Sequence, residues 1–288
     1  MMDRLLKAMG VLCMALNVST TSVASTTDGE KGTLTRQVLL GDHATGVTDT
    51  GGAGEPFILI HALGVDQRMW ANVIPILKAR GRVVTYDVRG FGSAAGAPGK
   101  PSMELFADDL RTLMDQLDIR RAHVVGLSMG GVIGQTFALA YPDRVASLAL
   151  VATVSRAQPA FSLRGQSVHV DGMPGQIPPT LTRWFTPAML AVNGDAVRYA
   201  RSAILSQSAQ QWEGSWEAMA QMKVYDRVHL ISAPTKVIAG ELDVSCPPAL
   251  MQHDIASRIP GAEMHVIPGA THMVSLTKPA ELAALLAK

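Results

Sequence analysis

The sequence contains little cysteine, and neither sign of charge predominates in it. Two cysteines in 288 residues cannot form a disulfide framework or a zinc site built from four cysteines. The 25 lysines and arginines against 24 aspartates and glutamates give a formal net charge of +1. The chain therefore lacks the basic excess typical of proteins that bind nucleic acid through a charged surface. What it does contain is apolar: hydrophobic residues make up 48% and charged residues 17%. This composition can bury a large core, and it excludes a disordered or fibrous chain.

The N-terminal segment has the pattern of a secretory signal peptide. Arg4 and Lys7 give a positive start, a mostly apolar run follows from Ala8 to Val18, and Ser22-Val23-Ala24 supplies the small residues of a cleavage site. The apolar run is shorter than the roughly 20 residues that span a bilayer. We therefore expect a signal peptide at 1–24 and an exported protein, in the periplasm or the medium, without an integral membrane span. A misassigned start or an unstructured tail is the alternative, and it would leave the protein in the cytoplasm.

The remaining chain, 25–288, alternates apolar runs with helical patterns. We expect strands at 37–40 (with a possible partner near 45–48), 57–60, 83–86, 123–127, 145–151, 235–239 and 263–267. Helices are expected at 67–79, from the cap residue Ser102 to about 117, at 130–140, at 248–259 and from 279, with Pro75 bending or breaking the first. This alternation predicts an α/β fold with a mostly parallel central sheet flanked by helices.

The alternation stops between about 155 and 230. This stretch is rich in Gln, Trp, Met and Pro, and helical pieces are expected at 187–193, 195–207 and 212–221. The strand and helix rhythm resumes after it. We therefore interpret 25–288 as a single α/β domain that carries a helical cap insertion at about 155–230.

Gly126-Leu127-Ser128-Met129-Gly130 matches the pattern G-x-S-x-G between an expected strand and an expected helix. In that context the serine occupies a sharp turn that lifts its hydroxyl into a cleft, and the flanking glycines leave room for the turn. Ser128 is therefore the expected nucleophile. A structural serine in a turn is the alternative reading.

A serine hydroxyl needs a base to take its proton, and in this architecture the acid and then the histidine follow the serine along the chain. Asp243 lies in the loop after the strand at 235–239, where an α/β sheet presents reactive groups, and it is the expected acid. Glu241 in the same loop is the alternative acid. His272 follows the strand at 263–267 and is the expected base.

The segment His61-Ala62-Leu63-Gly64 follows the strand at 57–60. Backbone N–H groups there and after the nucleophile can stabilise the oxyanion that forms when a carbonyl is attacked, so Leu63 and Met129 are the expected donors. His61 precedes the serine in the chain, so we expect it to hold this loop by hydrogen bonds rather than to act as the base.

Several segments together resemble the α/β-hydrolase superfamily, and most of all the branch of 3-oxoadipate enol-lactonases and related carboxylesterases. The similarity extends from about 55 to 287 and rests on motifs that include Asp87-Val88-Arg89-Gly90-Phe91-Gly92, Gly126-Leu127-Ser128-Met129-Gly130-Gly131, Pro268-Gly269-Ala270-Thr271-His272 and the cap-like Arg183-Trp184-Phe185-Thr186-Pro187. The resemblance implies Ser128, Asp243 and His272 as a catalytic triad and Leu63 and Met129 as oxyanion donors.

We therefore expect a serine hydrolase that cleaves a small carboxylic ester or lactone through an acyl-enzyme intermediate, without a metal or cofactor. A cofactor-free perhydrolase or a C–C bond hydrolase with the same triad is an alternative. A ligand-binding or receptor protein without turnover, on the same fold, is an alternative of another class.

The cap insertion is expected to determine the substrate. Trp184, Phe185 and Trp216 offer apolar surface for a pocket wall, although any one of them could simply hold the cap together. Arg183 or Arg164 could bind a substrate carboxylate, or could be solvated. Cys246 lies near the acid loop without an evident base, so no nucleophilic role is expected for it.

Overall fold

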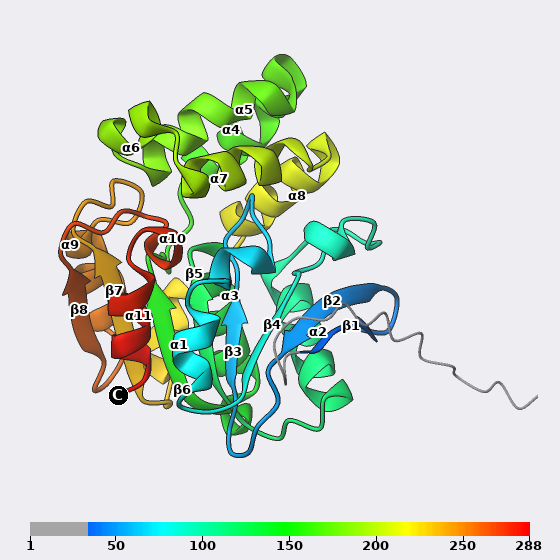
Figure 1. Cartoon of the computed structure of the whole chain (residues 1–288), viewed down its shortest axis with the longest axis vertical. Coiled ribbons are helices and arrows are strands. Elements are labelled where there is room, and N and C mark those ends of the chain that lie inside the picture. Colours follow the sequence, from blue (N-terminus) through cyan, green and yellow to red (C-terminus); the bar gives the residue numbers. More distant parts are fainter. Residues whose placement is uncertain (1–33) are drawn as a thin grey trace, which may run out of the picture.

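Residues 34–288 are described by the computed structural model, and they form an eight-stranded sheet covered by helices (Figure 1). The strands are β1 (Leu34–Leu39), β2 (Ala44–Asp49), β3 (Phe57–Ile60), β4 (Val83–Tyr86), β5 (Ala122–Leu127), β6 (Val145–Val151), β7 (Thr235–Gly240) and β8 (Glu263–Ile267). Their order across the sheet is β1-β2-β4-β3-β5-β6-β7-β8. Strands β3 to β8 pair in parallel, whereas β2 is antiparallel to both β1 and β4.

The middle of the sheet is buried on both faces. All four residues of β4 are buried, and in β3 only Phe57 is partly exposed. Because parallel strands with helices on both sides are buried on both faces, their sequences are continuous apolar runs. The edge strand β8 has an exposed first residue and partly exposed central ones.

Helices cover both faces. Helices α1 (Ile74–Lys78) and α11 (Pro279–Leu286) lie together in front of the sheet in the view of Figure 1, and α2 (Met103–Gln116) packs on α3 (Met129–Ala140) behind it. Short turns of helix occur at Gln67–Trp70, Gly92–Ala94, Pro142–Arg144, Pro248–Met251 (α9), Gln252–Ala256 and Val274–Thr277 (α10). The side chain of Ser102 accepts a hydrogen bond from Leu105 N–H, as expected of the residue that caps α2.

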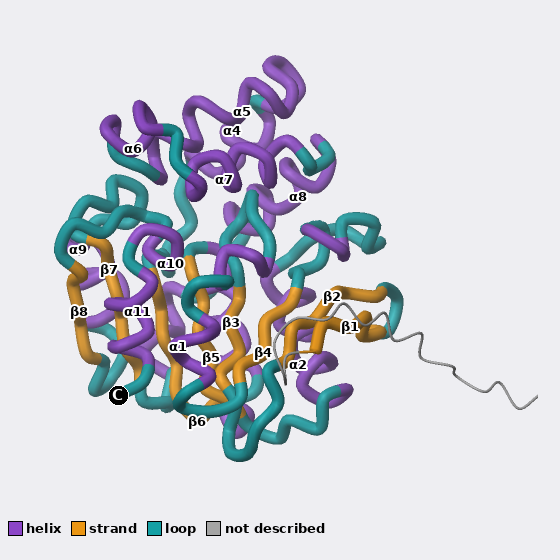
Figure 2. The backbone as a smooth tube through the Cα atoms, viewed as in Figure 1, coloured by secondary structure: helices purple, strands orange, loops and turns teal. Residues whose placement is uncertain are grey.

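A second layer lies over one end of the sheet. It comprises α4 (Ala160–Gln166), α5 (Val168–Trp184), α6 (Pro187–Val192), α7 (Asp195–Leu205) and α8 (Ala209–Ala220), followed by a 3₁₀ segment at Tyr225–Leu230. Figure 2 draws this layer in helix and loop colours only. We call the five helices α4 to α8 the cap.

The helix expected at 67–79 is broken near Pro75, as expected: a 3₁₀ turn at Gln67–Trp70 is followed by α1, and Pro75 lies in the first turn of α1, where its missing N–H costs no hydrogen bond. Two other details differ from the sequence-based expectations. The helix expected at 248–259 is a short α-helix followed by a π-helical turn. The helices α4 and α5 were not expected. Gly172 has a φ of 63° inside α5, and Pro174, Pro178 and Pro179 follow it, so the local sequence does not read as one helix.

The signal peptide expected at 1–24 lies outside the described residues. Among residues 34–288, no helix combines the length and the apolar character needed to cross a bilayer.

Candidate active site

Three loops at the carboxyl ends of parallel strands bring Ser128, Asp243 and His272 together. Ser128 follows β5, Asp243 follows β7 and His272 follows β8. The Nε2 atom of His272 lies 3.1 Å from Ser128 Oγ, and its Nδ1 atom lies 2.9 Å from Asp243 Oδ2. A carboxylate can only accept, so Nδ1 carries the proton and Nε2 of the neutral ring is free to accept from the serine hydroxyl. The three side chains thus form one chain of hydrogen bonds in the order required for proton removal from Ser128.

The backbone at Ser128 is strained. Its φ is 56° and its ψ is −116°, a conformation that residues with a Cβ rarely adopt. The neighbouring glycines are sterically required, because a Cβ on Gly126 would lie 2.1 Å from the oxygen of Gly130, and one on Gly130 would lie 2.3 Å from the oxygen of Ile60. This tight turn between β5 and α3 holds the Ser128 hydroxyl at the bottom of a cavity.

The carboxylate of Asp243 is fully buried and accepts three hydrogen bonds. Its Oδ1 receives the N–H groups of Ser245 and Cys246 at 2.7 and 2.9 Å, and its Oδ2 faces His272. Burial by itself raises the pKa of Asp243, but the charge and hydrogen bond of His272 and the two N–H groups outweigh it, so the net pKa is lowered. Asp243 therefore stays ionised beside the imidazole.

Glu241, the alternative acid, points elsewhere. Its side chain is exposed and accepts a 2.8 Å hydrogen bond from Gly269 N–H. This bond ties the loop after β7 to the loop that carries His272. In this geometry Glu241 does not contact the imidazole.

The two expected oxyanion donors have free N–H groups. Within residues 34–288, the N–H groups of Leu63 and Met129 donate to no acceptor of the chain. Met129 is the first residue of α3, so its N–H lies at the positive end of the helix dipole. His61 is fully buried, its Nδ1 lies 2.8 Å from Ala62 O, and its Nε2 accepts from Val88 N–H at 2.8 Å. Burial lowers the pKa of His61, which keeps it neutral while it holds this loop in place, as expected.

A small cavity separates these groups from the cap. Leu63, Ser128 and His272 line it from below, and Trp184 and Trp216 line it from the cap. The indole of Trp184 lies roughly parallel to the His272 ring, with 6.4 Å between centroids. Phe185 does not line this cavity; it is buried and borders a separate apolar hollow with Met189 and Leu276. The cavity volume is only ≈ 40 Å³, far below the about 300–1,000 Å³ of typical ligand pockets, so the cap side chains must shift to admit substrate.

The cap contacts the loop of Leu63 directly, a link that the sequence did not reveal. Gly64 has a φ of +86°, and a Cβ there would lie 3.0 Å from the ring of Trp184 and 3.3 Å from that of Trp212. The hydroxyl of Tyr199 in α7 lies 3.0 Å from Asp66 Oδ1 and accepts from Asp66 N–H at 3.2 Å. These residues are far apart in sequence, and only the folded chain brings them together.

Asp243, Cys246 and His272 offer ligand atoms within 4.8 Å of one another, the one such cluster among the described residues. Two of these three side chains are already hydrogen-bonded in the serine–histidine–aspartate chain. Burial, and then the charge of Asp243, raise the pKa of the Cys246 thiol well above its usual value. A protonated, buried thiol fits the expectation that Cys246 is not a nucleophile.

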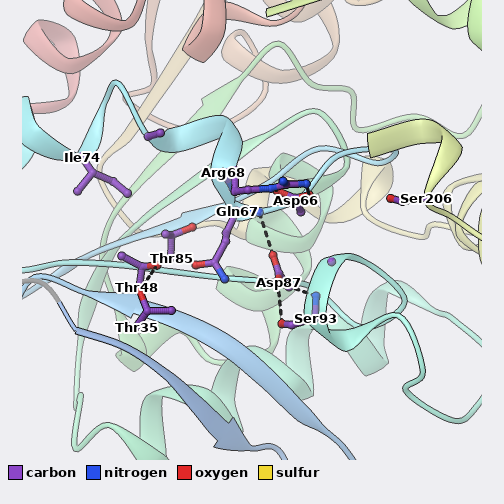
Figure 3. Close-up of a pocket in the computed structure, with 12 residues that line it drawn as sticks. Thr35, Thr48, Asp66, Gln67, Arg68, Ile74, Thr85, Asp87, Ser93 and Ser206 are labelled. Atoms are coloured by element: carbon purple, nitrogen blue, oxygen red, sulfur yellow. Dashed lines mark hydrogen bonds and ion pairs between the residues drawn. The ribbon is translucent and has the colours of Figure 1, made fainter. Parts of the chain in front are cut away.

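A much larger hollow, of ≈ 600 Å³, lies beside β1 and β2 (Figure 3). Its polar side chains hydrogen-bond to nearby groups of the chain. Asp87 accepts from Gln67 N–H at 2.9 Å and from the N–H and hydroxyl of Ser93 at 2.8 and 2.7 Å. Asp66 is paired with Arg68 at 2.6 Å. No histidine or cysteine lines it, so it holds neither an imidazole base nor a thiol nucleophile.

Comparison with known proteins agrees with this geometry. The α/β hydrolase fold family model matches residues 55–279. A 3-oxoadipate enol-lactonase of Acinetobacter baylyi is 31% identical over 217 residues, which cover 74% of this chain and 79% of that protein. The enol-lactonase structure from Burkholderia xenovorans LB400 matches with a TM-score of 0.82 and 26% identity, covering 87% and 97% of the two chains. An esterase from Thermogutta terrifontis, solved with malate bound, matches with a TM-score of 0.78 and 29% identity, covering 84% and 91%. The chain therefore belongs to the α/β hydrolase fold family.

Proposed function

We propose that the protein is a serine hydrolase that cleaves small carboxylic esters or lactones. The observation that carries this proposal is the continuous chain of hydrogen bonds from Ser128 Oγ through His272 to the buried Asp243, at 3.1 and 2.9 Å. The similarity to enol-lactonases and an esterase supports the ester or lactone bond as the target.

In the first half of the reaction, Ser128 Oγ attacks the carbonyl carbon while His272 Nε2 takes its proton. Asp243 holds the imidazole in the required tautomer and stabilises its charged form. The N–H groups of Leu63 and Met129 stabilise the oxyanion of the tetrahedral intermediate. His272 then gives the proton to the leaving alcohol oxygen, which leaves an acyl ester on Ser128.

In the second half, His272 takes a proton from water, which attacks the acyl-enzyme. The tetrahedral intermediate collapses, the acid leaves, and the proton returns to Ser128 Oγ. For a lactone the alcohol and the acid are parts of one product. Apart from the substrate and water, this mechanism uses only side chains and backbone groups of the chain.

Replacing the nucleophile tests this proposal. Ser128→Ala should lower turnover of every ester and lactone by about a millionfold, as in serine proteases whose nucleophile is removed. Rates on para-nitrophenyl acetate and a fluorophosphonate label located by mass spectrometry measure it. Ser202→Ala, at an exposed serine of α7, is the matched control and should keep both turnover and labelling. Full turnover in Ser128→Ala, or a label on another residue, would contradict the proposal.

The same assays separate the alternatives. A perhydrolase should form peracid from a carboxylic acid and hydrogen peroxide faster than it hydrolyses esters. A C–C bond hydrolase should cleave a diketone faster than an ester. A binding protein should release no more than one equivalent of para-nitrophenol per chain.

We further propose that residues 1–24 are removed as a signal peptide and that 25–288 is the exported enzyme, with its cap at about 155–230. The charged start, apolar run and small residues before Ser25 support cleavage there. Mass spectrometry of the native protein should find an N-terminus at or near Ser25 in the periplasm or medium. An intact Met1 terminus in the cytoplasmic fraction would contradict this.

A further inference from the structure

The backbone oxygen of Ser128 accepts a short hydrogen bond from a side chain outside its own helix. Thr153 lies just beyond the end of β6, and its Oγ1 lies 2.6 Å from Ser128 O. The N–H groups of Gly131 and Val132, in the first turn of α3, donate to the same oxygen at 2.9 and 3.2 Å. Val154 O is 3.5 Å from the Thr153 hydroxyl, so Ser128 O is the closer acceptor.

The Thr153 side chain is tightly held in this position. It is fully buried, and a Cβ on Gly131 would lie 2.6 Å from both its Cβ and its Oγ1, so α3 can approach this closely only with glycine there. Gln135 Nε2 of α3 donates to Val154 O at 2.9 Å, which is a second link between this segment and the helix. Val154 lines the cavity above Ser128, but Thr153 does not. Any effect of the Thr153 hydroxyl on catalysis must therefore act through the Ser128 carbonyl.

This carbonyl belongs to the same peptide unit as Met129 N–H, the proposed oxyanion donor. The Ser128–Met129 peptide bond is trans, so the planar unit points its C=O and its N–H in opposite directions. Ser128 N–H donates to Val151 O at 2.9 Å, which fixes the backbone before Ser128 Cα but not the peptide unit after it. Hydrogen bonds to the carbonyl oxygen hold that following unit, and they also polarise it, which makes its N–H a stronger donor.

We propose that Thr153 is a positioning residue that aligns Met129 N–H with the oxyanion of the tetrahedral intermediate. This inference rests on the proposed function, because the oxyanion forms only if Ser128 attacks a carbonyl. The bonds from Gly131 and Val132 come from α3 itself, whereas the Thr153 hydroxyl ties the peptide unit to the segment that leaves the sheet. Removal of a whole oxyanion donor costs about 100–1,000-fold in kcat. Loss of the Thr153 hydroxyl should cost less, because the N–H group remains and only its alignment and polarisation change.

Two substitutions that differ by one oxygen atom test the alignment. Thr153→Ser keeps the hydroxyl and Thr153→Ala removes it, while both lose the same methyl group. We expect kcat on para-nitrophenyl butyrate to be about tenfold lower in Thr153→Ala than in Thr153→Ser, the effect of about one hydrogen bond. Thr153→Ser should stay within about threefold of the wild type. Thr153→Cys fills the space with a weaker donor and should fall between, so it gives the same comparison if the alanine variant does not fold.

Thr45 provides a matched control. It is also fully buried, and its Oγ1 donates to a backbone oxygen, that of Asp87, at 2.6 Å. Thr45 lies in β2, which β4 and β3 separate from the strand that precedes Ser128. Thr45→Ala should lower the midpoint of thermal unfolding relative to Thr45→Ser, as at position 153, but the two variants should have the same kcat.

A pair of ketones separates alignment of the donor from a general loss of structure. In 1,1,1-trifluoropentan-2-one the carbonyl is electrophilic enough for Ser128 Oγ to add to it. The Oγ–C bond forms, the π electrons move to the carbonyl oxygen, and the hydroxyl proton goes to His272 Nε2, so the adduct resembles the tetrahedral intermediate. Pentan-2-one has the same carbon chain without this reactivity. In NMR titrations, Thr153→Ala should bind the trifluoro ketone about tenfold more weakly than Thr153→Ser does and bind pentan-2-one equally well.

The outcomes distinguish this inference from the proposed function. Equal kcat in Thr153→Ala and Thr153→Ser, or equal weakening of both ketones by the loss of the hydroxyl, would overturn the alignment role and leave the hydrolase proposal intact. Absence of ester turnover in the wild type, with a trifluoro ketone adduct that still depends on the Thr153 hydroxyl, would instead overturn the hydrolase proposal alone.

Discussion

The large hollow beside Asp87 and the small cavity above Ser128 use their polar groups in opposite ways. In the large hollow the carboxylates of Asp66 and Asp87 are occupied by hydrogen bonds and an ion pair within the chain. In the small cavity Arg164 and Arg183 have no carboxylate partner among the described residues, and a strained serine faces an imidazole. The small cavity is therefore the proposed catalytic site because its reactive groups lack other partners, although the large hollow has the greater volume.

The largest change in turnover should follow from replacing Asp243, the proposed acid of the small cavity. Asp243→Asn should lower kcat by about 10,000-fold, by analogy with the same change in a serine protease, because the amide favours the wrong tautomer of His272. Glu241→Gln, two residues earlier in the loop, should change kcat by less than about tenfold. Initial rates on one ester compare the two. The reverse ranking would move the acid to Glu241.

A smaller change, in the preference among substrates, should follow from replacing the tryptophans that line the same cavity from the cap. Trp184→Ala or Trp216→Ala should change the ratio of kcat/KM between short and longer esters by about 10–200-fold, the range for altered apolar contacts with a substrate. Val192→Ala, at an exposed residue of the cap, is the control and should leave that ratio unchanged. If both tryptophan variants fold normally and lower every rate by one common factor, the cap does not determine specificity.

The smallest effect on turnover should come from the large hollow. Asp87→Asn places an amide where the carboxylate now accepts from Gln67 and Ser93, so at least one of these partly buried donors should lose its charged partner. We expect the free energy of unfolding to fall by about 1–3 kcal/mol, while kcat changes by less than about threefold. Urea denaturation and initial rates measure the two quantities. A loss of turnover comparable to that of Ser128→Ala, in a folded protein, would place chemistry in the large hollow.

Local sequence patterns predicted the sheet and its adjacent helices well. The expected strands at 83–86 and 145–151 agree with β4 and β6 to the residue, and Ser102 caps α2 as expected. Buried parallel strands have a strong apolar signal, and the residue that caps a helix N-terminus acts within one turn of that helix. Both features can therefore be recognised from neighbouring residues in the sequence. The cap was harder to predict from the sequence, because the prolines and the kink at Gly172 interrupt the helical pattern of α5.

The candidate site was predictable to the extent that it follows chain order. Ser128, Asp243 and His272 each follow a strand, and that placement could be read from the sequence. The missing partners of Arg164 and Arg183, and the separation of Phe185 from the cavity, depend on how the cap helices pack on the sheet. No local pattern encodes these distances, since they join residues many positions apart.

The contacts at Gly64 and Asp66 mean that the loop after β3 is held in place by the cap as well as by the sheet. Trp184 and Trp212 pack closely against Gly64, and Tyr199 is hydrogen-bonded to Asp66. Leu63, the proposed oxyanion donor, lies next to Gly64 in the same loop. An exchange of caps between related hydrolases would therefore leave this loop without its supports. The transferable unit for engineering is the cap together with the segment from His61 to Asp66, because the alignment of the oxyanion donor would otherwise be lost along with the old specificity.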